Sequence, residues 1–197
     1  MARPRSEQAH RAALDATVEL LLEAGAEGVT LEEVAARSGV AKTTLYRHFE
    51  SRHGLIAQAA RCCVVEHATP DTGSLAEDLR ILFARFGEGA GEQRINDLLP
   101  LLIDAGTRDP EMRDLVTSML QERKRPIRTV LQLAQLRGEV GPDLDLDTAL
   151  AMVIGPFTYR KTVERREVTP AFAEAVLVGA IAALRATATA PADPAPV

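Results

Sequence analysis

The chain has few aromatic residues and almost no cysteine: its 197 positions hold no tryptophan, two tyrosines, five phenylalanines and two cysteines. The cysteines, Cys62 and Cys63, are adjacent, which excludes a Cys-x-x-Cys metal knuckle and a stable disulfide between them. We interpret them as helix residues of a protein in a reducing compartment, with redox sensing as the minor alternative.

Long apolar runs are also missing. No segment approaches the roughly 20 apolar residues that a membrane-spanning helix needs. The N-terminus begins with basic residues, but no apolar signal core follows them. We therefore expect a cytoplasmic protein that has no membrane partner.

The patterns of common enzyme sites are absent as well. The sequence has no His-Glu-x-x-His, no glycine-rich phosphate loop and no nucleophile paired with a base, and its four histidines are scattered. Asp143, Asp145 and Asp147 alternate as in a calcium loop, but the glycine and distal glutamate of that motif are missing. We expect no enzymatic activity, no cofactor and no metal site.

Alanine, leucine, glutamate and arginine dominate what is present, and runs typical of β-strands are lacking. This composition predicts an all-α fold. The formal net charge of −5 argues against a protein that binds DNA over its whole surface. Any nucleic-acid interface must therefore be a local patch.

One segment, residues 30–52, organises the rest of the chain. Thr30 followed by Glu33 is a capping box, which predicts a short helix that begins at Leu31. Gly39 should end this helix, because glycine accepts the positive φ found at many helix C-termini. A second short helix is expected to begin at residue 41 or 42. Two short helices joined by a glycine turn are typical of a helix-turn-helix, and the alternative is an ordinary pair of surface helices.

The second of these helices carries the side chains that a DNA reader needs. Basic groups can neutralise phosphate or pair with guanine edges, and hydroxyl groups can donate to phosphate or touch a thymine methyl group. Arg52 falls in the first turn of the next expected helix, from which it can reach a phosphate at the edge of the groove. The candidate DNA-binding residues are Thr30, Lys42, Thr43, Thr44, Tyr46, Arg47, His48 and Arg52.

The amino-acid sequence of this segment resembles that of a known protein family. Thr-Leu-Tyr-x-x-Phe follows Gly-Val, and a basic residue stands three positions after the phenylalanine. Over residues 7–60 the chain is similar to the DNA-binding domain of the tetracycline-repressor (TetR) family. The matching positions are Gly25, Thr30, Val34, Ala35, Gly39, Val40, Thr44, Leu45, Tyr46, Phe49, Arg52 and Leu55.

The last two expected helices are apolar around much of their circumference. A monomer would leave part of this surface in water, which is unfavourable by roughly 25 cal/mol per Å². Self-association into a two-fold dimer is the natural solution, and the family resemblance implies the same. The candidate interface residues are Leu150, Val153, Phe157, Phe172, Val176, Ile181 and Leu184.

The resemblance also implies a small-molecule pocket among the middle helices, roughly residues 53–137. Few aromatic residues and few charges occur on the apolar faces there, so we expect a lipophilic ligand. Each of these side chains has the alternative role of ordinary core. The candidate lining residues are Cys63, Phe83, Phe86, Leu99, Leu102, Ile103, Met112 and Met119.

Three prolines fall inside helical patterns: Pro100, Pro126 and Pro156. Proline removes one backbone hydrogen bond and clashes with the preceding turn. We therefore expect a kink or boundary at the first, a bend at the second and an interrupted helix at the third.

These features predict three regions: a DNA-binding domain at 1–52, a ligand-binding and dimerisation domain at 53–188, and a disordered tail at 189–197. The predicted function is a homodimeric transcription regulator, a repressor released from a palindromic double-stranded operator by a small effector. The alternative is a DNA-binding regulator without a small-molecule ligand, controlled by a protein partner or constitutive.

Overall fold

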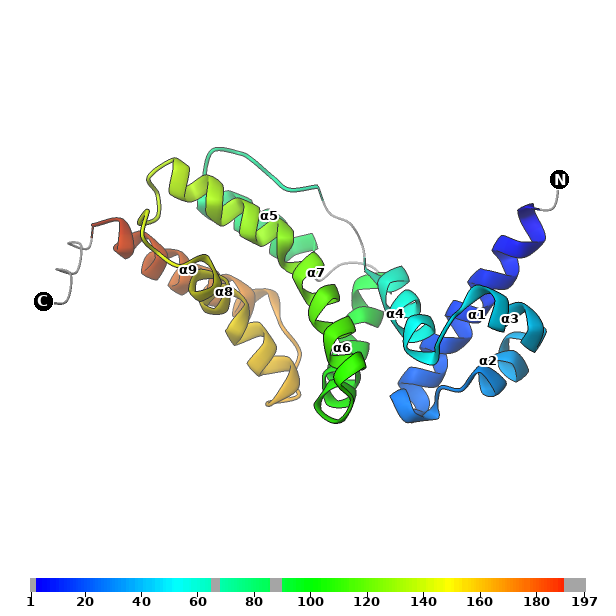
Figure 1. Cartoon of the computed structure of the whole chain (residues 1–197). Helices are drawn as coiled ribbons and strands as arrows, with labels where there is room; N and C mark the ends of the chain where they lie inside the picture. The colour runs from blue at the N-terminus through cyan, green and yellow to red at the C-terminus, as the bar shows by residue number, and fades with distance from the viewer. Residues whose placement is uncertain (1–2, 65–67, 86–89, 190–197) are drawn as a thin grey trace, which may run out of the picture. The chain divides into compact units, whose positions relative to one another are not determined.

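The computed structural model describes residues 3–64, 68–85 and 90–189 of the chain, and every regular element in those ranges is helical (Figure 1). The all-α fold predicted from composition and helix patterns is therefore confirmed. The α-helices are α1 (Arg3–Ala24), α2 (Leu31–Ser38), α3 (Lys42–His48), α4 (Arg52–Cys63), α5 (Leu75–Arg85), α6 (Ala90–Arg108), α7 (Pro110–Leu136), α8 (Leu146–Thr162) and α9 (Pro170–Ala186). Short 3-10 turns follow α1 and α9, at Ala26–Gly28 and Thr187–Thr189.

The chain divides into two compact units. The first unit comprises residues 1–66 and 88–123, and the second comprises residues 67–87 and 124–197. This division does not follow the domain boundary predicted after residue 52. The reason is that α4 packs against α1 and α6, and buries Leu55, Ile56 and Ala59 among their side chains. Residues 190–197 of the predicted tail lie outside the described residues.

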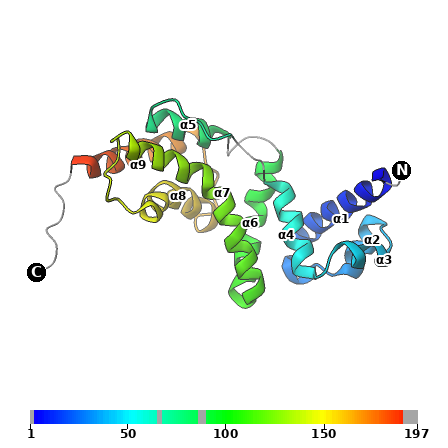
Figure 2. The same cartoon turned by 45° about the horizontal axis from the view of Figure 1, so that its top comes forward.

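The core of the first unit joins α1 to the helix pair α2–α3 and to α4, which lie together in Figure 2. Helix α1 presents an apolar stripe to the others, with the spacing expected of a helix that is buried on one side. Phe49, directly after α3, is buried, and its ring stacks on His10 of α1 at 5.1 Å between centroids. The principal buried side chains are Leu14, Val18, Leu21, Val34, Leu45, Phe49, Leu55, Ile56, Leu98 and Leu102.

The local signals that predicted α2 are present in the structure. The Thr30 hydroxyl accepts a hydrogen bond from the Glu33 amide at 3.1 Å and so begins the helix. Gly39 ends it with φ 69°, a left-handed conformation that favours glycine, and its amide donates to the Ala35 carbonyl. These two caps fix where α2 begins and where it ends.

The second unit contains α5, the C-terminal part of α7, α8 and α9. Its core is made of aliphatic side chains from all four helices, and three phenylalanines extend it at one side. The Phe83 and Phe157 rings stack at 4.5 Å, and Phe172 meets Phe157 edge-on at 6.0 Å. The principal buried residues are Leu75, Leu79, Leu82, Val130, Leu131, Ala149, Leu150, Val153, Leu177, Ile181 and Leu184.

A buried polar cluster holds the start of α5 to the end of α7. Asp78 is 0% exposed, and its carboxylate accepts hydrogen bonds from the Thr72 amide at 2.8 Å and from the Thr72 hydroxyl at 2.9 Å. Arg137 lies 3.4 Å from the same carboxylate and 2.9 Å from Glu139. Glu139 in turn accepts from the Leu75 amide, an otherwise unpaired donor in the first turn of α5.

The three internal prolines do not divide their helices. Pro100 lies within α6, Pro126 within α7 and Pro156 within α8, and each helix continues on both sides. The interruption predicted at Pro156 is therefore wrong. Packing on both sides of the missing hydrogen bond keeps each helix continuous, since tertiary contacts outweigh local preference.

Candidate nucleic-acid interface

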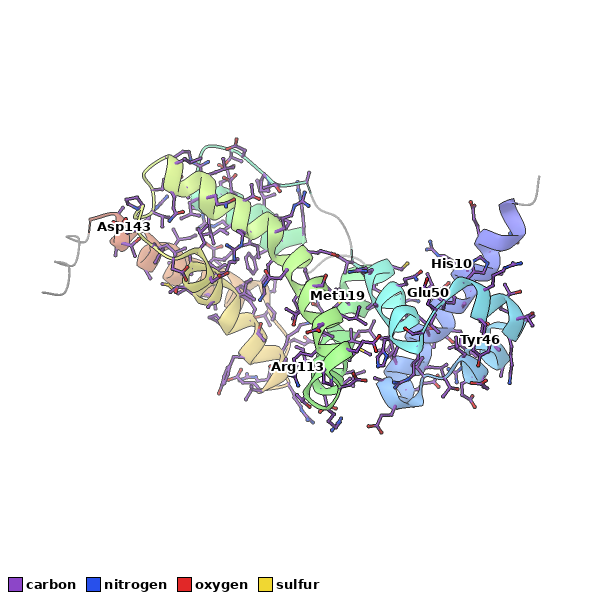
Figure 3. All side chains as sticks on the ribbon, in the orientation of Figure 1. His10, Tyr46, Glu50, Arg113, Met119 and Asp143 are labelled. Carbon is purple, nitrogen blue, oxygen red and sulfur yellow. The ribbon has the colours of Figure 1, made fainter. Side chains whose placement is uncertain are left out.

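Helix α3 presents most of the predicted DNA-binding side chains to solvent. Lys42, Thr43 and Arg47 are exposed, and Tyr46 is 57% exposed at the surface of the helix (Figure 3). Leu45 points the other way, into the core. This arrangement follows from helical spacing, because one buried residue in a two-turn helix leaves its neighbours on the outer side.

Glu32 of α2 contacts two of these side chains and was not among the predicted site residues. The Tyr46 hydroxyl donates to the Glu32 carboxylate at 3.1 Å, and the Lys42 ammonium lies 3.8 Å from the same oxygen. The carboxylate's own backbone amide and the Tyr46 hydroxyl hold the pKa of Glu32 below its usual value. The same hydrogen bond raises the pKa of Tyr46. An ionised carboxylate therefore sits among the groups that would meet DNA.

Replacing this carboxylate should make DNA binding tighter and less selective. In Glu32→Gln, the negative charge that repels phosphate is lost and Lys42 is no longer neutralised. We expect affinity for non-specific DNA to rise roughly threefold or more, with a steeper salt dependence. Fluorescence anisotropy across a salt series measures both quantities. Glu167→Gln removes an exposed carboxylate from the second unit and is the control; equal behaviour of the two variants would contradict this role.

His48 and Thr44 are less available than their neighbours on α3. Both are partly buried, and the His48 ring lies 5.9 Å from the ring of His10 and 6.5 Å from that of Phe49. His48 therefore belongs to a small ring cluster between α1 and α3. Thr30 is exposed, and its hydroxyl already caps α2.

Arg52 is turned toward the protein rather than toward the predicted phosphate position. Its Nε donates to the Val29 carbonyl at 2.8 Å, and its Nη2 donates to the Ala26 carbonyl. Both carbonyls belong to the turn between α1 and α2. In this conformation Arg52 ties the start of α4 to that turn, and its role as a groove-edge phosphate donor stays a prediction.

Arg52→Ala should therefore act on stability more than on electrostatics. Loss of two charge-assisted hydrogen bonds is expected to lower the free energy of unfolding by about 1–3 kcal/mol. The slope of log affinity against log salt should stay unchanged, because no phosphate contact is lost. Urea unfolding followed by circular dichroism measures the first effect, and anisotropy at several salt concentrations measures the second. A shallower slope with unchanged stability would restore the phosphate role.

A second polar link holds α4 to the start of α7. His53 Nε2 lies 2.6 Å from the Asp109 carboxylate and His53 Nδ1 lies 3.1 Å from Glu111. The hydrogen bond with His53, followed by the Met112 amide, lowers the pKa of Asp109. The Asp109 part of this link is therefore present above the usual aspartate pKa and is lost as the pH falls through the lowered value.

Comparison with known proteins decides the family. Residues 13–59, which contain the helix pair just described, match the bacterial regulatory proteins of the tetR family. Residues 69–180 match the tetracyclin repressor-like C-terminal domain. The chain belongs to the TetR family. The resemblance inferred from residues 7–60 is thereby confirmed and extends over most of the sequence.

Individual relatives agree with the TetR assignment. The HTH-type transcriptional regulator YdeS of Bacillus subtilis (strain 168) is 28% identical over 190 residues, 94% of each chain. The biofilm operon icaADBC HTH-type negative transcriptional regulator IcaR of Staphylococcus aureus (strain Newman) is 34% identical over 50 residues, 25% of this chain and 27% of IcaR. The crystal structure of a transcriptional regulator from Rhodococcus sp. Rha1 has the same fold, with a TM-score of 0.68, 18% identity and coverage of 92% and 99%.

This TetR-family chain is therefore a transcriptional regulator with a helix-turn-helix DNA-binding domain. Its families and relatives are regulators and not enzymes. Within the described ranges, none of the helices has the length and apolar character needed to cross a lipid bilayer.

The predicted ligand-lining residues do not form one pocket in this TetR-family structure. Six lie in the first unit, where Cys63, Leu102, Met112 and Met119 are buried and Leu99 is partly buried. Ile103 is 42% exposed. Phe83 belongs to the core of the second unit, and Phe86 lies outside the described residues. The space bordered by Leu102, Met112 and Met119 is only about 10 Å³, so these side chains are packed core.

The predicted dimer residues also need correction. Leu150, Val153, Ile181 and Leu184 are buried within the second unit, so they leave little side-chain surface for a partner. Phe157, Phe172 and Val176 are partly buried, and the first two pack on each other. The helices are apolar on several sides, and it is another side of α9 that faces solvent. The exposed residues there are Ala171, Ala175, Val178 and Ala182.

Proposed function

We propose that this regulator is a cytoplasmic homodimeric repressor, which binds a palindromic operator through α3 and is released from it by a small lipophilic ligand. The observation that supports DNA reading is the outer side of α3. There Lys42, Tyr46 and Arg47 are exposed, while Leu45 of the same helix is buried in the core of the first unit. A short recognition helix on a fixed frame is the arrangement that places side chains in a major groove.

The dimer is proposed on the exposed side of α9. Ala171, Ala175, Val178 and Ala182 are spaced by four, three and four residues, so they form one apolar stripe along the helix. Small side chains allow two such helices to approach closely. A two-fold dimer can place its two recognition helices about 34–36 Å apart, one turn of DNA, so that each reads one half of a palindrome.

A charge in this stripe should separate the subunits. Val178 is 51% exposed, and in Val178→Glu each carboxylate would be buried without a partner across the two-fold axis. We expect the dimer dissociation constant to rise roughly 100-fold or more, as measured by analytical ultracentrifugation. Val163→Glu, at a valine that is 64% exposed and lies after α8, is the matched control. Equal dissociation constants for the two variants would rule out the stripe as the interface.

Repression is the proposed direction of regulation. The similarity to IcaR, whose name describes a negative regulator, supports this direction. A repressor needs only to occupy its operator, and the exposed residues of α3 supply the means. A ligand that binds the DNA-free conformation more tightly than the DNA-bound one would then lower operator affinity. The decrease equals the ratio of its affinities for the two conformations.

The first experiment is binding to DNA from just upstream of the protein's own gene. Fluorescence anisotropy across a salt series, with unrelated DNA as control, should show salt-dependent binding that exceeds the control by at least roughly 1000-fold. Binding equal to the control for upstream DNA, and for sites selected from a random pool, would refute the proposed operator function.

A regulator without a small-molecule effector is the second candidate. The tight packing around Met112 and Met119, where the sequence predicted a pocket, favours it. A screen of small lipophilic molecules against the operator complex distinguishes the two candidates. Release of DNA by one compound class supports the ligand-responsive form, and a protein partner found on the operator complex supports the alternative.

A further inference from the structure

The first unit contains a larger cavity, and Cys63 is the one residue predicted to bind ligand that lines it. Its volume is about 190 Å³, and it lies between α1, α4 and α6. A cavity of about 150 Å³ is enough to hold benzene, so this one has room for a single ring or a short acyl chain. The lining residues are Arg11, Leu14, Asp15, Val18, Ala59, Cys62, Cys63, Gly91 and Arg94.

Three helix faces meet at this cavity. On α1, Arg11, Leu14, Asp15 and Val18 follow the spacing of one helix face. Facing them, α4 contributes Ala59 with the two cysteines, and α6 contributes Gly91 one turn before Arg94. Gly91 has no side chain, so α6 adds no side-chain atoms to the cavity at this position.

The cavity has an apolar floor and a charged rim. Leu14, Val18, Ala59 and Cys63 are buried and line the floor. The rim residues, Arg11, Asp15, Cys62 and Arg94, are exposed. A ligand that fits both parts must have an apolar body and one polar end.

The charge of that polar end follows from the two arginines. Elsewhere in the first unit, Arg37, Arg61 and Arg108 each bind a carboxylate of the protein. Among the described side chains, no carboxylate lies within ion-pair distance of Arg11 or Arg94. Asp15 is the one acidic residue among the described residues of the lining, where the two arginines give the rim a positive balance. Guanidinium groups prefer carboxylates, which they can bind through two parallel hydrogen bonds.

We propose that this cavity binds a small organic monocarboxylate, with its carboxylate held by Arg11 and Arg94 and its ring or chain against Leu14 and Val18. The second part of the proposal rests on the proposed operator function: a ligand in the cavity also regulates DNA binding. The ligand touches α1, which packs on α2 and α3, and α4, which follows the helix-turn-helix directly. A ligand that fits one arrangement of α1 and α4 better than another shifts operator affinity by that difference.

The binding test uses benzoate and hexanoate as probes on the full-length protein without DNA, with benzyl alcohol and hexan-1-ol as uncharged counterparts. Amide chemical shifts, that of Gly91 above all, report binding directly. Both acids should bind saturably, and at least tenfold more tightly than the alcohols. Because Cys62 is exposed on the rim, bound benzoate should also slow its alkylation by iodoacetamide.

Three variants locate the site. Arg94→Gln should weaken benzoate binding at least tenfold and leave benzyl alcohol binding unchanged. Arg108→Gln removes an arginine from the same helix that is already paired with Asp104, and it should change neither. Gly91→Leu should abolish binding of acid and alcohol together, because it fills the cavity. Thermal unfolding of each variant confirms that it remains folded. Absence of saturable binding, or equal benzoate affinity in Arg94→Gln and the parent protein, would overturn the site.

The regulatory part has a separate readout. Benzoate should weaken operator binding in the parent protein and not in Arg94→Gln, as measured by anisotropy. If benzoate binds but operator affinity is unchanged, the site stands and its role in regulation is overturned. If no operator is found at all, the proposed DNA function fails, while the chemical shifts still decide whether the cavity takes a carboxylate.

Discussion

Operator binding should fall at least roughly 30-fold when either Lys42 or Tyr46 is replaced by alanine. Each side chain is exposed on the outer side of α3, in a position to reach phosphate or base edges. In a two-fold dimer, one substitution removes the contact from both half-sites, so the losses combine. The Lys42→Ala variant should also have a shallower salt dependence, since it loses one cation per subunit.

The matched control for these variants is Lys161→Ala, at an exposed lysine near the end of α8. It removes the same charge without touching the first unit, and its operator affinity should equal that of the parent. Anisotropy titrations measure the affinities, and sedimentation confirms that all variants remain dimeric. Unchanged operator binding in both α3 variants would show that α3 is not the recognition helix.

The largest loss of stability is expected from Asp78→Ala. The substitution leaves Arg137 without one of its carboxylates and leaves the Thr72 amide and hydroxyl without their acceptor. Breaking a buried charge cluster from one side costs about 3 kcal/mol or more, because the remaining polar groups stay desolvated. Urea unfolding monitored by circular dichroism should show this decrease.

The control for Asp78→Ala is Asp143→Ala, at an exposed aspartate in the same unit, which is labelled in Figure 3. It should change the free energy of unfolding by less than about 0.5 kcal/mol, as is usual for exposed positions. A difference of under about 1 kcal/mol between the two variants would contradict a structural role for the buried cluster.

The same cluster should make the second unit sensitive to acid. Burial raises the pKa of Glu139, but hydrogen bonds from the Leu75 amide, Arg137 and Arg185 outweigh it, and the pKa lies below the usual glutamate value. A lowered pKa gives stability that is fully present above the unfolded value of 4.5 and is lost as the pH falls through the folded value. Loss of stability below about pH 4.5 is therefore expected to be smaller in Glu139→Gln.

Local signals were sufficient to predict the helix-turn-helix from the sequence. The capping box at Thr30, the glycine at position 39 and the buried Leu45 act within a few residues of one another, so their consequences can be worked out without the fold. The contacts of Arg52 could not be predicted in this way. Its acceptors lie 23 and 26 residues earlier in the chain, and only the packed turn after α1 brings them within reach.

Which faces of α8 and α9 are buried could not be predicted from the sequence, for a different reason. When a helix is apolar on several sides, its sequence pattern does not indicate which side faces the core. Ile181 and Val178 are therefore equivalent in the sequence until their neighbours in the fold are known. The structure buries Ile181 and leaves Val178 exposed. The cavity between α1, α4 and α6 was missed similarly, because its lining comes from three helices that are far apart in the sequence.

The prolines inside α6, α7 and α8 have a consequence for amide hydrogen exchange. Proline has no amide hydrogen, so the carbonyls four residues earlier, at Asn96, Glu122 and Met152, lose their partners in the helix. Protection against deuterium therefore need not run unbroken along each helix. The residues before each proline can open separately from those after it. Amide exchange rates should therefore differ between the two parts of one continuous helix.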